Sequence, residues 1–551
     1  MRETALQHHQ AGRFAEAIEA CQHTLAIHPN DAATLQTLGN ALLALQRVDE
    51  AIEAYRQGLF AQPNSAGLHI NLANALRTAG RLEEAVISYR SAILVYPKRA
   101  QSYSDLGHVL CLLERHEEAV QPYRQALALN PDDANTLIGL ASVLLVLKEY
   151  EDACEHFQRA LRLRPDDTSV LYGLGCSLLA QFRHKDAVPY LERAAELRPE
   201  HNDTRAALGN ALLGANRNAE ALLHYRTAEE SNKDAAGLQL NQALALLGNG
   251  AWSEGWQRFE ARFSAVPEAL PGLDLPKDAV FWRGEDIAGR TILLQAEQGF
   301  GDTILCVRYA PLVAERGAKI VLRVQYQLAK LVAEMRGIDT LLTNIDPTPA
   351  IDLVCPLMSL PLAFGTEIAT VPGNVPYLKT PSAYRLLWQT LLGVRRRPRI
   401  GVAWRGQQHL PHRSMPLEKL APLLRCASYE FHGLQKEMTE ADREWLAANP
   451  LLIDHSAELQ DFADTAAIAE EMDLVISIDT SVAHLAGALA RPLWIMLPFS
   501  GDFRWLLDRG DSPWYPTARL FRQERPGDWD QVVADVVRAL LSLQAEGEAI
   551  P

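Results

Sequence analysis

Basic residues are few for a chain of 551 residues: 53 Lys and Arg stand against 68 Asp and Glu, a net charge of −15 at pH 7. Nucleic acids and anionic membranes bind basic surfaces, so this balance argues against a general binder of either. No apolar run is long enough to cross a bilayer, and the first residues lack the apolar segment of a signal peptide. We therefore expect a cytoplasmic protein with no membrane span and no nucleic-acid partner.

Cysteine is also scarce. The seven cysteines are scattered, and none forms a Cys-x-x-Cys pair. Such spacing favours reduced thiols over disulfides or a zinc site. We identify no histidines and carboxylates at the spacing of metal ligands either. We expect no metal ion and no bound cofactor.

What the first half does contain is a repeat of 34 residues. The same interval separates six prolines and seven alanines, and small residues and aromatic rings recur with it. They are Pro29, Pro63, Pro97, Pro131, Pro165 and Pro199, with Ala17, Ala51, Ala85, Ala119, Ala153, Ala187 and Ala221. A period of this length is typical of a helix–turn–helix unit that stacks on its neighbours. Small residues let the two helices approach closely, and proline ends the second helix.

This pattern resembles the tetratricopeptide repeat over residues 1–263. The resemblance implies an all-α solenoid of about seven repeats followed by a capping repeat. The last unit departs from the pattern, with Gly255 in place of alanine and the rings of Trp252, Trp256 and Phe259. We expect these rings to dock on the domain that follows.

The resemblance also implies a concave groove that binds extended peptides or protein surfaces. Five asparagines occupy positions that should face this groove: Asn40, Asn71, Asn74, Asn210 and Asn241. Their amides can hydrogen-bond a peptide backbone without reading its side chains, so they are candidate acceptor-binding residues. The middle repeats break the row, for example with Asp105. Ordinary polar residues on a solvated face are therefore an equal alternative.

The sequence changes character after residue 263. Residues 264–280 contain three prolines and are expected to form a linker. Short apolar or β-branched runs then alternate with helical stretches, a pattern typical of parallel, doubly wound α/β sheets. The predicted strands are Thr291–Ala296, Lys319–Val324, Ile351–Cys355, Arg399–Trp404, Tyr429–Leu434, Asp473–Ile478 and Leu493–Leu497. The segment 381–398 separates them into two lobes, which we assign to 281–390 and 391–551.

Each lobe carries a polar turn at the end of a predicted strand. Glycines there let a ligand approach the backbone, and amides and hydroxyls at a helix start suit a phosphate. Helix capping by aspartate, and an ordinary interior histidine, are the alternatives for these residues taken alone. The turns are Gly299, Gly301, Asp302 and Thr303 in the first lobe and Asp479, Thr480, Ser481 and His484 in the second.

Together the two turns resemble those of the heptosyltransferase-like branch (family 9) of the GT-B glycosyltransferases. Fused to repeats, they resemble bacterial tetratricopeptide-repeat flagellin glycosyltransferases. The resemblance implies a GT-B fold of two Rossmann-like lobes, the first supplying a catalytic base and the second binding the nucleotide sugar. It gives the base as Asp302, the contact to the donor phosphate as Lys436, and the nucleotide-binding turn as Asp479 to His484. Ser481 replaces the glycine that these enzymes generally have, so the identity of the donor does not follow.

These residues predict metal-independent, inverting transfer of a sugar. Asp302 takes the proton of the acceptor hydroxyl in this hypothesis, and Glu297 is the alternative base. The leaving phosphate needs cations besides the helix N-termini. Trp514 and Tyr515 are either stacking partners for the donor or packing residues. The candidate cations are Arg405, Arg413 and Lys436.

Three functions fit these features. The first is a protein glycosyltransferase that uses a nucleotide-sugar donor and recruits an acceptor such as flagellin through its repeats. The second is a transferase acting on a lipid or a saccharide, against which the acidic balance and the length of the array argue. The third is a non-catalytic adaptor with a degenerate GT-B domain, against which the intact turns argue. The first is the function that we predict.

Overall fold

The computed structural model describes residues 2–230, 235–265, 279–297, 299–406 and 413–546. The chain divides into two compact units, residues 1–207 and 208–551. The first unit is helical, and the second combines helices with two parallel sheets. None of the helices in these ranges is long and apolar enough to cross a membrane.

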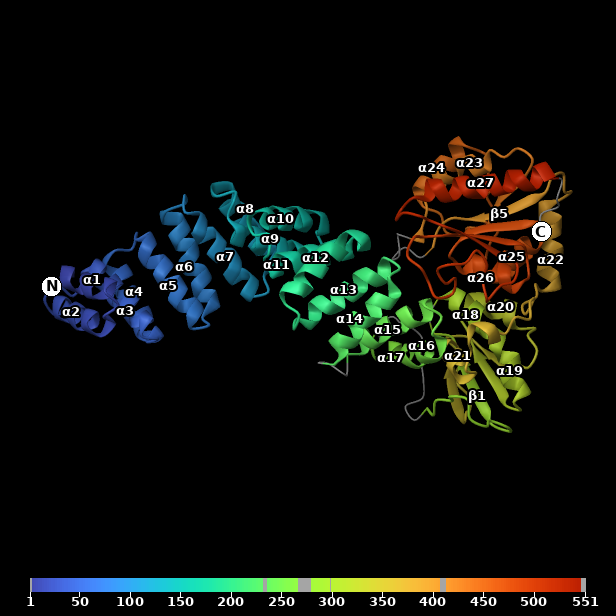
Figure 1. Ribbon diagram of the computed structural model, residues 1–551, viewed down its shortest axis with the longest axis horizontal. Coiled ribbons are helices and arrows are strands. Elements are labelled where there is room, and N and C mark those ends of the chain that lie inside the picture. The colour runs from blue at the N-terminus through green and yellow to red at the C-terminus, as the bar shows by residue number, and fades with distance from the viewer. Residues whose placement is uncertain (1, 231–234, 266–278, 298, 407–412, 547–551) are drawn as a thin grey trace. The chain divides into compact units, whose positions relative to one another are not determined.

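The first unit is a stack of helix pairs, which follow one another in sequence order in Figure 1. Each repeat proline lies two residues after the end of a second helix, as predicted. The all-α solenoid expected for this part is confirmed. Its helices are α1 (Arg2–Gln10), α2 (Phe14–Ile27), α3 (Ala32–Ala44), α4 (Val48–Ala61), α5 (Ala66–Thr78), α6 (Leu82–Val95), α7 (Ala100–Leu112), α8 (His116–Leu129), α9 (Ala134–Val146), α10 (Tyr150–Leu163), α11 (Thr168–Ala180), α12 (His184–Leu197) and α13 (Asn202–Gly214), which crosses into the second unit.

A small residue and a ring form the packing centre of a repeat. The seven repeat alanines are completely buried. A Cβ built on Gly39 would lie 2.4 Å from Cε1 of Tyr55, whose ring occupies the space that the glycine leaves. The Tyr55 hydroxyl donates to Asn40 Oδ1 at 2.7 Å, so the ring is also held at its polar end. The small residue and the ring recur every 34 residues because two helices of a repeat pack closely around that ring.

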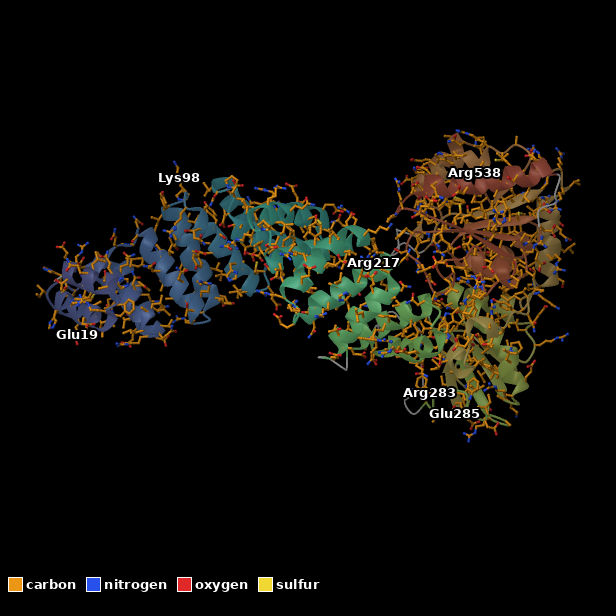
Figure 2. The ribbon with its side chains drawn as sticks, in the orientation of Figure 1. Glu19, Lys98, Arg217, Arg283, Glu285 and Arg538 are labelled. Carbon is orange, nitrogen blue, oxygen red and sulfur yellow. The ribbon has the colours of Figure 1, made fainter. Side chains whose placement is uncertain are left out.

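The turn inside each repeat has a conformation that the sequence pattern does not predict. One residue with positive φ recurs every 34 positions: Gly12, Gln46, Gly80, Glu114, Lys148, Phe182, Asn216 and Gly250. Positive φ is disfavoured for most side chains, so the pairing of the two helices imposes it here. The next residue is often an arginine that pairs with an acid three positions later. Arg217, labelled in Figure 2, pairs with Glu220 at 2.6 Å in this way.

The second unit contains two parallel sheets (Figure 1). All seven predicted strands are present within two residues of their expected bounds, so the predicted α/β class is confirmed. The first sheet has the order β3-β2-β1-β4, with β1 (Thr291–Gln295), β2 (Lys319–Arg323), β3 (Thr340–Leu342) and β4 (Leu353–Pro356). The second has the order β6-β5-β7-β8-β9, with β5 (Arg399–Ala403), β6 (Glu430–Gly433), β7 (Leu474–Ile478), β8 (Leu493–Leu497) and β9 (Ala518–Arg522).

The helices of the second unit precede and flank these sheets. The predicted linker 264–280 lies mostly outside the described residues. The predicted lobe boundary at residue 390 falls inside helix α22. This helix packs on α25, where Trp388 Nε1 donates to Asp464 Oδ1 at 3.0 Å. The helices are α14 (Asn218–Glu229), α15 (Ala236–Gly248), α16 (Trp252–Phe259), α17 (Arg262–Ala265), α18 (Phe300–Cys306), α19 (Ala310–Glu315), α20 (Tyr326–Val332), α21 (Leu360–Ala363), α22 (Ser382–Leu392), α23 (Ala421–Leu424), α24 (Glu440–Ala448), α25 (Phe462–Glu470), α26 (Ser481–Ala488) and α27 (Trp529–Glu546).

The last repeat packs on the α/β part through its aromatic residues, as expected. Trp252 stacks on Trp514, with ring centroids 5.4 Å apart. Trp256 meets the Phe503 ring edge-on at 5.5 Å, and its Nε1 donates to the Thr366 carbonyl at 3.1 Å. The end of the array and the sheets therefore share one hydrophobic core.

Replacing Gly39 by alanine should destabilise the first unit by about 1–3 kcal/mol, because the new Cβ overlaps the buried Tyr55 ring. Gly67→Ala is the matched control, since its Cβ meets only the flexible end of Gln36, at 3.3 Å. Urea unfolding followed by circular dichroism measures both variants. Equal stability of the two would contradict this account of the packing.

Candidate active site

Two helix N-termini from the two sheets meet in the second unit. Helix α18 follows β1 and helix α26 follows β7, and a Cβ built on Gly301 would lie 2.8 Å from Cδ2 of His484. In parallel sheets, ligands bind beyond the carboxyl ends of strands where the strand order reverses. β1 and β7 both lie at such reversals, β1 beside β4 and β7 beside β5. The structure thus brings together the two turns that the sequence singled out.

A chain of alternating charges runs through this junction. Asp302 contacts Arg504, whose guanidinium also binds Asp502 at 2.9 Å. Arg413 lies 3.2 Å from Asp502 and 3.3 Å from Asp479. Three carboxylates therefore share two guanidiniums.

Burial sets the electrostatics of this chain. The Asp302 side chain keeps 17% of its surface exposed and that of Asp479 only 6%. Burial raises the pKa of Asp479, although Arg413 opposes the shift. Burial acts in the same direction on Asp502, but the neighbouring arginines outweigh it and hold its pKa well below the usual range. Of the carboxylates in the two helix turns, Asp302 is thus more accessible to solvent than Asp479.

His484 is a buried, neutral imidazole in this arrangement. Its Nδ1 lies 2.9 Å from the Tyr515 hydroxyl, and its ring stacks on Trp505 with centroids 5.2 Å apart. Burial lowers its pKa to about 3. Its Nε2 is 4.0 Å from Asp479 Oδ1. At neutral pH the ring therefore adds no positive charge to the site.

Trp514 and Tyr515 are packing residues. Neither has exposed surface, so the alternative that they stack on a donor is wrong. Arg308 lies over both rings, at 5.4 and 4.9 Å, and its Nη1 donates to the Trp514 carbonyl at 2.8 Å. The pair is part of the core that joins the lobes and the last repeat.

Glu297, the alternative base, has both carboxylate oxygens engaged. Oε1 accepts from Arg262 at 2.9 Å and from the Met358 amide at 2.9 Å, and Oε2 accepts from Arg262 at 3.1 Å. Arg262 also pairs with Glu260 at 2.6 Å. Glu297 is 3% exposed and Arg262 is 2% exposed. Both oxygens of Glu297 are thus engaged inside the core, whereas the Asp302 side chain keeps 17% of its surface exposed.

Two of the three predicted cations have other partners. Arg405 binds both oxygens of Asp442, at 3.1 and 3.2 Å. Lys436 is exposed and donates to the Gln460 carbonyl. Arg413 is the predicted cation that the structure joins to the two turns.

The remaining predicted donor-binding residues shape the helix starts. Gly299 is the N-cap of α18 and Thr480 that of α26. Thr303 is buried and donates to Gln325 Oε1 at 3.0 Å. Ser481, the first residue of α26, is half-buried. Their contact with a donor stays a prediction.

The sequence interpretation assigned no role to Asp502 or Arg504. Both follow the carboxyl end of β8, as site residues of parallel sheets commonly do.

The sequence interpretation also overlooked the Asp-x-Asp pattern of Asp528 and Asp530 at the start of α27. Asp530 pairs with Lys419 at 2.6 Å. Within the described ranges, no group of three or more His, Cys, Asp or Glu could hold a metal ion.

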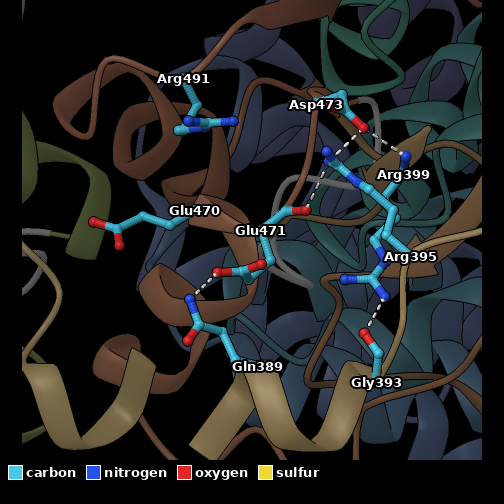
Figure 3. A pocket seen from close by; sticks show the side chains of 8 residues that line it. All are labelled: Gln389, Gly393, Arg395, Arg399, Glu470, Glu471, Asp473 and Arg491. Atoms are coloured by element: carbon cyan, nitrogen blue, oxygen red, sulfur yellow. Dashed lines mark hydrogen bonds and ion pairs between the residues drawn. The ribbon is translucent and has the colours of Figure 1, made fainter. Parts of the chain in front are cut away.

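Figure 3 shows a separate pocket of about 300 Å³, whose lining includes Arg395, Arg399 and Asp473. Arg395 and the Arg399 amide both bond to Asp473 there, at 2.6 and 2.8 Å. Arg399 begins β5 and Asp473 precedes β7, so the pocket is at the amino ends of the strands. We assign it no role in the candidate site.

Four of the five candidate acceptor-binding asparagines form two hydrogen-bonded pairs. Asn71 Nδ2 donates to Asn40 Oδ1 at 3.0 Å, and Asn241 Nδ2 donates to Asn210 Oδ1 at 2.9 Å. Asn74 accepts from the Tyr89 hydroxyl. These bonds orient the amides within the array, and their role in acceptor binding stays a prediction.

The tetratricopeptide repeat family matches residues 8–69, 64–132, 132–200, 172–236 and 206–255. Residues 8–255 are tetratricopeptide repeats. The resemblance of the first half of the chain to tetratricopeptide repeats is thus confirmed.

Among curated proteins, the chain is 26% identical over 344 residues to protein FlbA of Caulobacter vibrioides, covering 57% of this chain and 56% of FlbA. The chain thus matches about half the length of this relative. Among solved structures it is similar to YrrB, described as a TPR protein with an unusual peptide-binding site (19% identity, 34% of this chain and 96% of YrrB, TM-score 0.32). PilF of Pseudomonas aeruginosa is also similar (22% identity, 37% of this chain and 92% of PilF, TM-score 0.32).

Replacing Arg262 by alanine should destabilise the second unit by about 3–5 kcal/mol, because it leaves Glu297 buried without its counter-charge. Arg258→Ala is the control, since that side chain is 27% exposed and its loss should cost less than about 1 kcal/mol. All ten tryptophans lie in the second unit, so tryptophan fluorescence during urea unfolding reports on it. Similar losses for the two variants would contradict the assigned role of Arg262.

Proposed function

We propose that the protein is a glycosyltransferase of the GT-B type that transfers a sugar from a nucleotide-sugar donor to a protein acceptor. The observation that carries this proposal is the convergence of Asp302, Arg413 and Arg504 where the N-terminal turns of α18 and α26 meet. Two doubly wound parallel sheets with polar residues at their carboxyl ends support it, as does the resemblance of both turns to family 9.

In the proposed reaction the Asp302 carboxylate takes the proton of the acceptor hydroxyl. The acceptor oxygen then bonds to the anomeric carbon, and the bond from that carbon to the phosphate oxygen breaks on the opposite face. The electron pair leaves with the nucleotide, so the configuration inverts. Arg413, which pairs with Asp479, and Arg504, which pairs with Asp302, are the cations that can stabilise the negative charge of the leaving group.

The repeats support a protein acceptor, because tetratricopeptide repeats present surfaces for protein–protein interaction. The resemblance to flagellin glycosyltransferases makes flagellin the first acceptor to test. The alternative acceptors are a lipid and a saccharide. Intact-protein mass spectrometry of candidate acceptors detects the predicted product directly.

A non-catalytic adaptor is the second candidate function. The ion pair between Asp302 and Arg504 favours this function, because the carboxylate can have a purely structural role in joining the two lobes. A panel of UDP-, GDP- and CMP-activated sugars in a thermal-shift assay separates the two functions. An enzyme is stabilised by its donor, whereas an adaptor is stabilised by none of them.

Asp302→Asn should lower transfer at least about 100-fold while donor binding persists, because the amide cannot accept the proton. Transfer is measured by acceptor mass and donor binding by calorimetry. Asp511→Asn is the control, since Asp511 is 66% exposed and pairs only with Arg509 among the described residues. Turnover of Asp302→Asn at the wild-type rate would refute the role of Asp302 as base.

Asn71→Ala should weaken acceptor binding about 3- to 10-fold, the effect of losing one or two amide hydrogen bonds. Gln57→Ala is the control, because Gln57 is exposed on a second helix and bonds to Glu53 of the same helix. Fluorescence anisotropy with labelled acceptor measures both. Unchanged affinity of Asn71→Ala would favour the alternative of a solvated polar face.

A further inference from the structure

One turn of the repeat array holds the loop that follows β8. The Nδ2 of Asn216 donates to the Phe499 carbonyl at 2.7 Å, and its Oδ1 accepts from the Gly501 amide at 2.8 Å. Next to it, the Ser500 hydroxyl donates to the Gly214 carbonyl at 3.0 Å. The asparagine side chain thus pairs with the loop backbone in both directions, as a neighbouring strand would.

Asn216 is suited to this contact by its backbone. It is the positive-φ residue of the turn between α13 and α14, at φ 64°. Asparagine tolerates this conformation better than most residues and has one donor and one acceptor at its tip. The other repeats have Gln, Glu, Lys, Phe or Gly at the same position of the turn.

The loop leads directly to the charged chain of the candidate site. Asp502 follows Gly501, and its Oδ1 accepts from the Arg504 amide at 2.9 Å and from the Arg504 guanidinium at 2.9 Å. Arg504 in turn contacts Asp302. A displacement of the loop backbone therefore moves both charges relative to Asp302.

We propose that Asn216 is a positioning residue of the candidate active site: it holds the loop 499–501 so that Asp502 and Arg504 stay beside Asp302. Its effect on sugar transfer rests on the proposed function, whereas its effect on the loop does not. The last turns of the array then contribute to the geometry of the site.

Asn216→Gly removes the amide and keeps a residue that adopts positive φ without strain. Lys148→Gly is the matched control at the same position of another repeat, where the side chain is exposed. Asn216→Asp is the conservative variant, since it still accepts from the Gly501 amide but cannot donate to Phe499. Unchanged circular dichroism and melting temperature establish that the three variants fold.

Hydrogen exchange of the full-length chain tests the contact. The amides of residues 499–506 should exchange about tenfold faster in Asn216→Gly than in the wild type, and at an intermediate rate in Asn216→Asp. Lys148→Gly should exchange as the wild type does. Wild-type exchange of this loop in Asn216→Gly would overturn the proposal.

Steady-state kinetics test the consequence, using the donor that the panel of UDP-, GDP- and CMP-activated sugars identifies. Asn216→Gly should lower kcat about tenfold with acceptor affinity unchanged, and Asn216→Asp should restore part of the loss. Faster exchange with a wild-type kcat would overturn the positioning role. If the wild-type chain transfers no sugar, the proposed function fails, and hydrogen exchange alone decides whether Asn216 holds the loop.

Discussion

A buried guanidinium connects the end of the repeat array to the sheets of the second unit. Arg262 on α17 is 2% exposed, and a charge removed from water needs partners in defined positions. Glu297 and Glu260 provide them. Glu297 is the second residue after the end of β1 and lies five residues before Asp302. The ion pair that occupies Glu297 therefore fixes the chain just after β1, five residues before Asp302.

The compact units of the chain do not follow its repeats. The division falls after residue 207, inside α13, although the repeat family matches continue to residue 255. The reason is burial: Trp252 and Trp256 place their rings among Trp514, Phe503 and the first lobe. The last helix pairs thus share a core with the sheets.

Features with a local signal in the sequence could be predicted, and features that depend on distant partners could not. The 34-residue period located the helix ends, and apolar runs located seven of the nine described strands, including the edge strands β4 and β6. The other two edge strands were missed because β3 has only three residues and β9 is partly exposed. Positive φ at Phe182 has no signal in the residue type. Asp302 could be proposed from its turn, but its contact with Arg504 joins residues 202 positions apart.

The charge balance of the site has a consequence for the order of events in the proposed reaction. Asp302, Asp479 and Asp502 share Arg413 and Arg504, and His484 is neutral, so this cluster carries one net negative charge when all three carboxylates are ionised. A phosphate repels such a cluster unless it replaces a carboxylate at one of the guanidiniums. Asp302 is the most exposed of the three carboxylates. A donor phosphate that takes its place on Arg504 frees the carboxylate to accept a proton, which couples donor binding to the availability of the base.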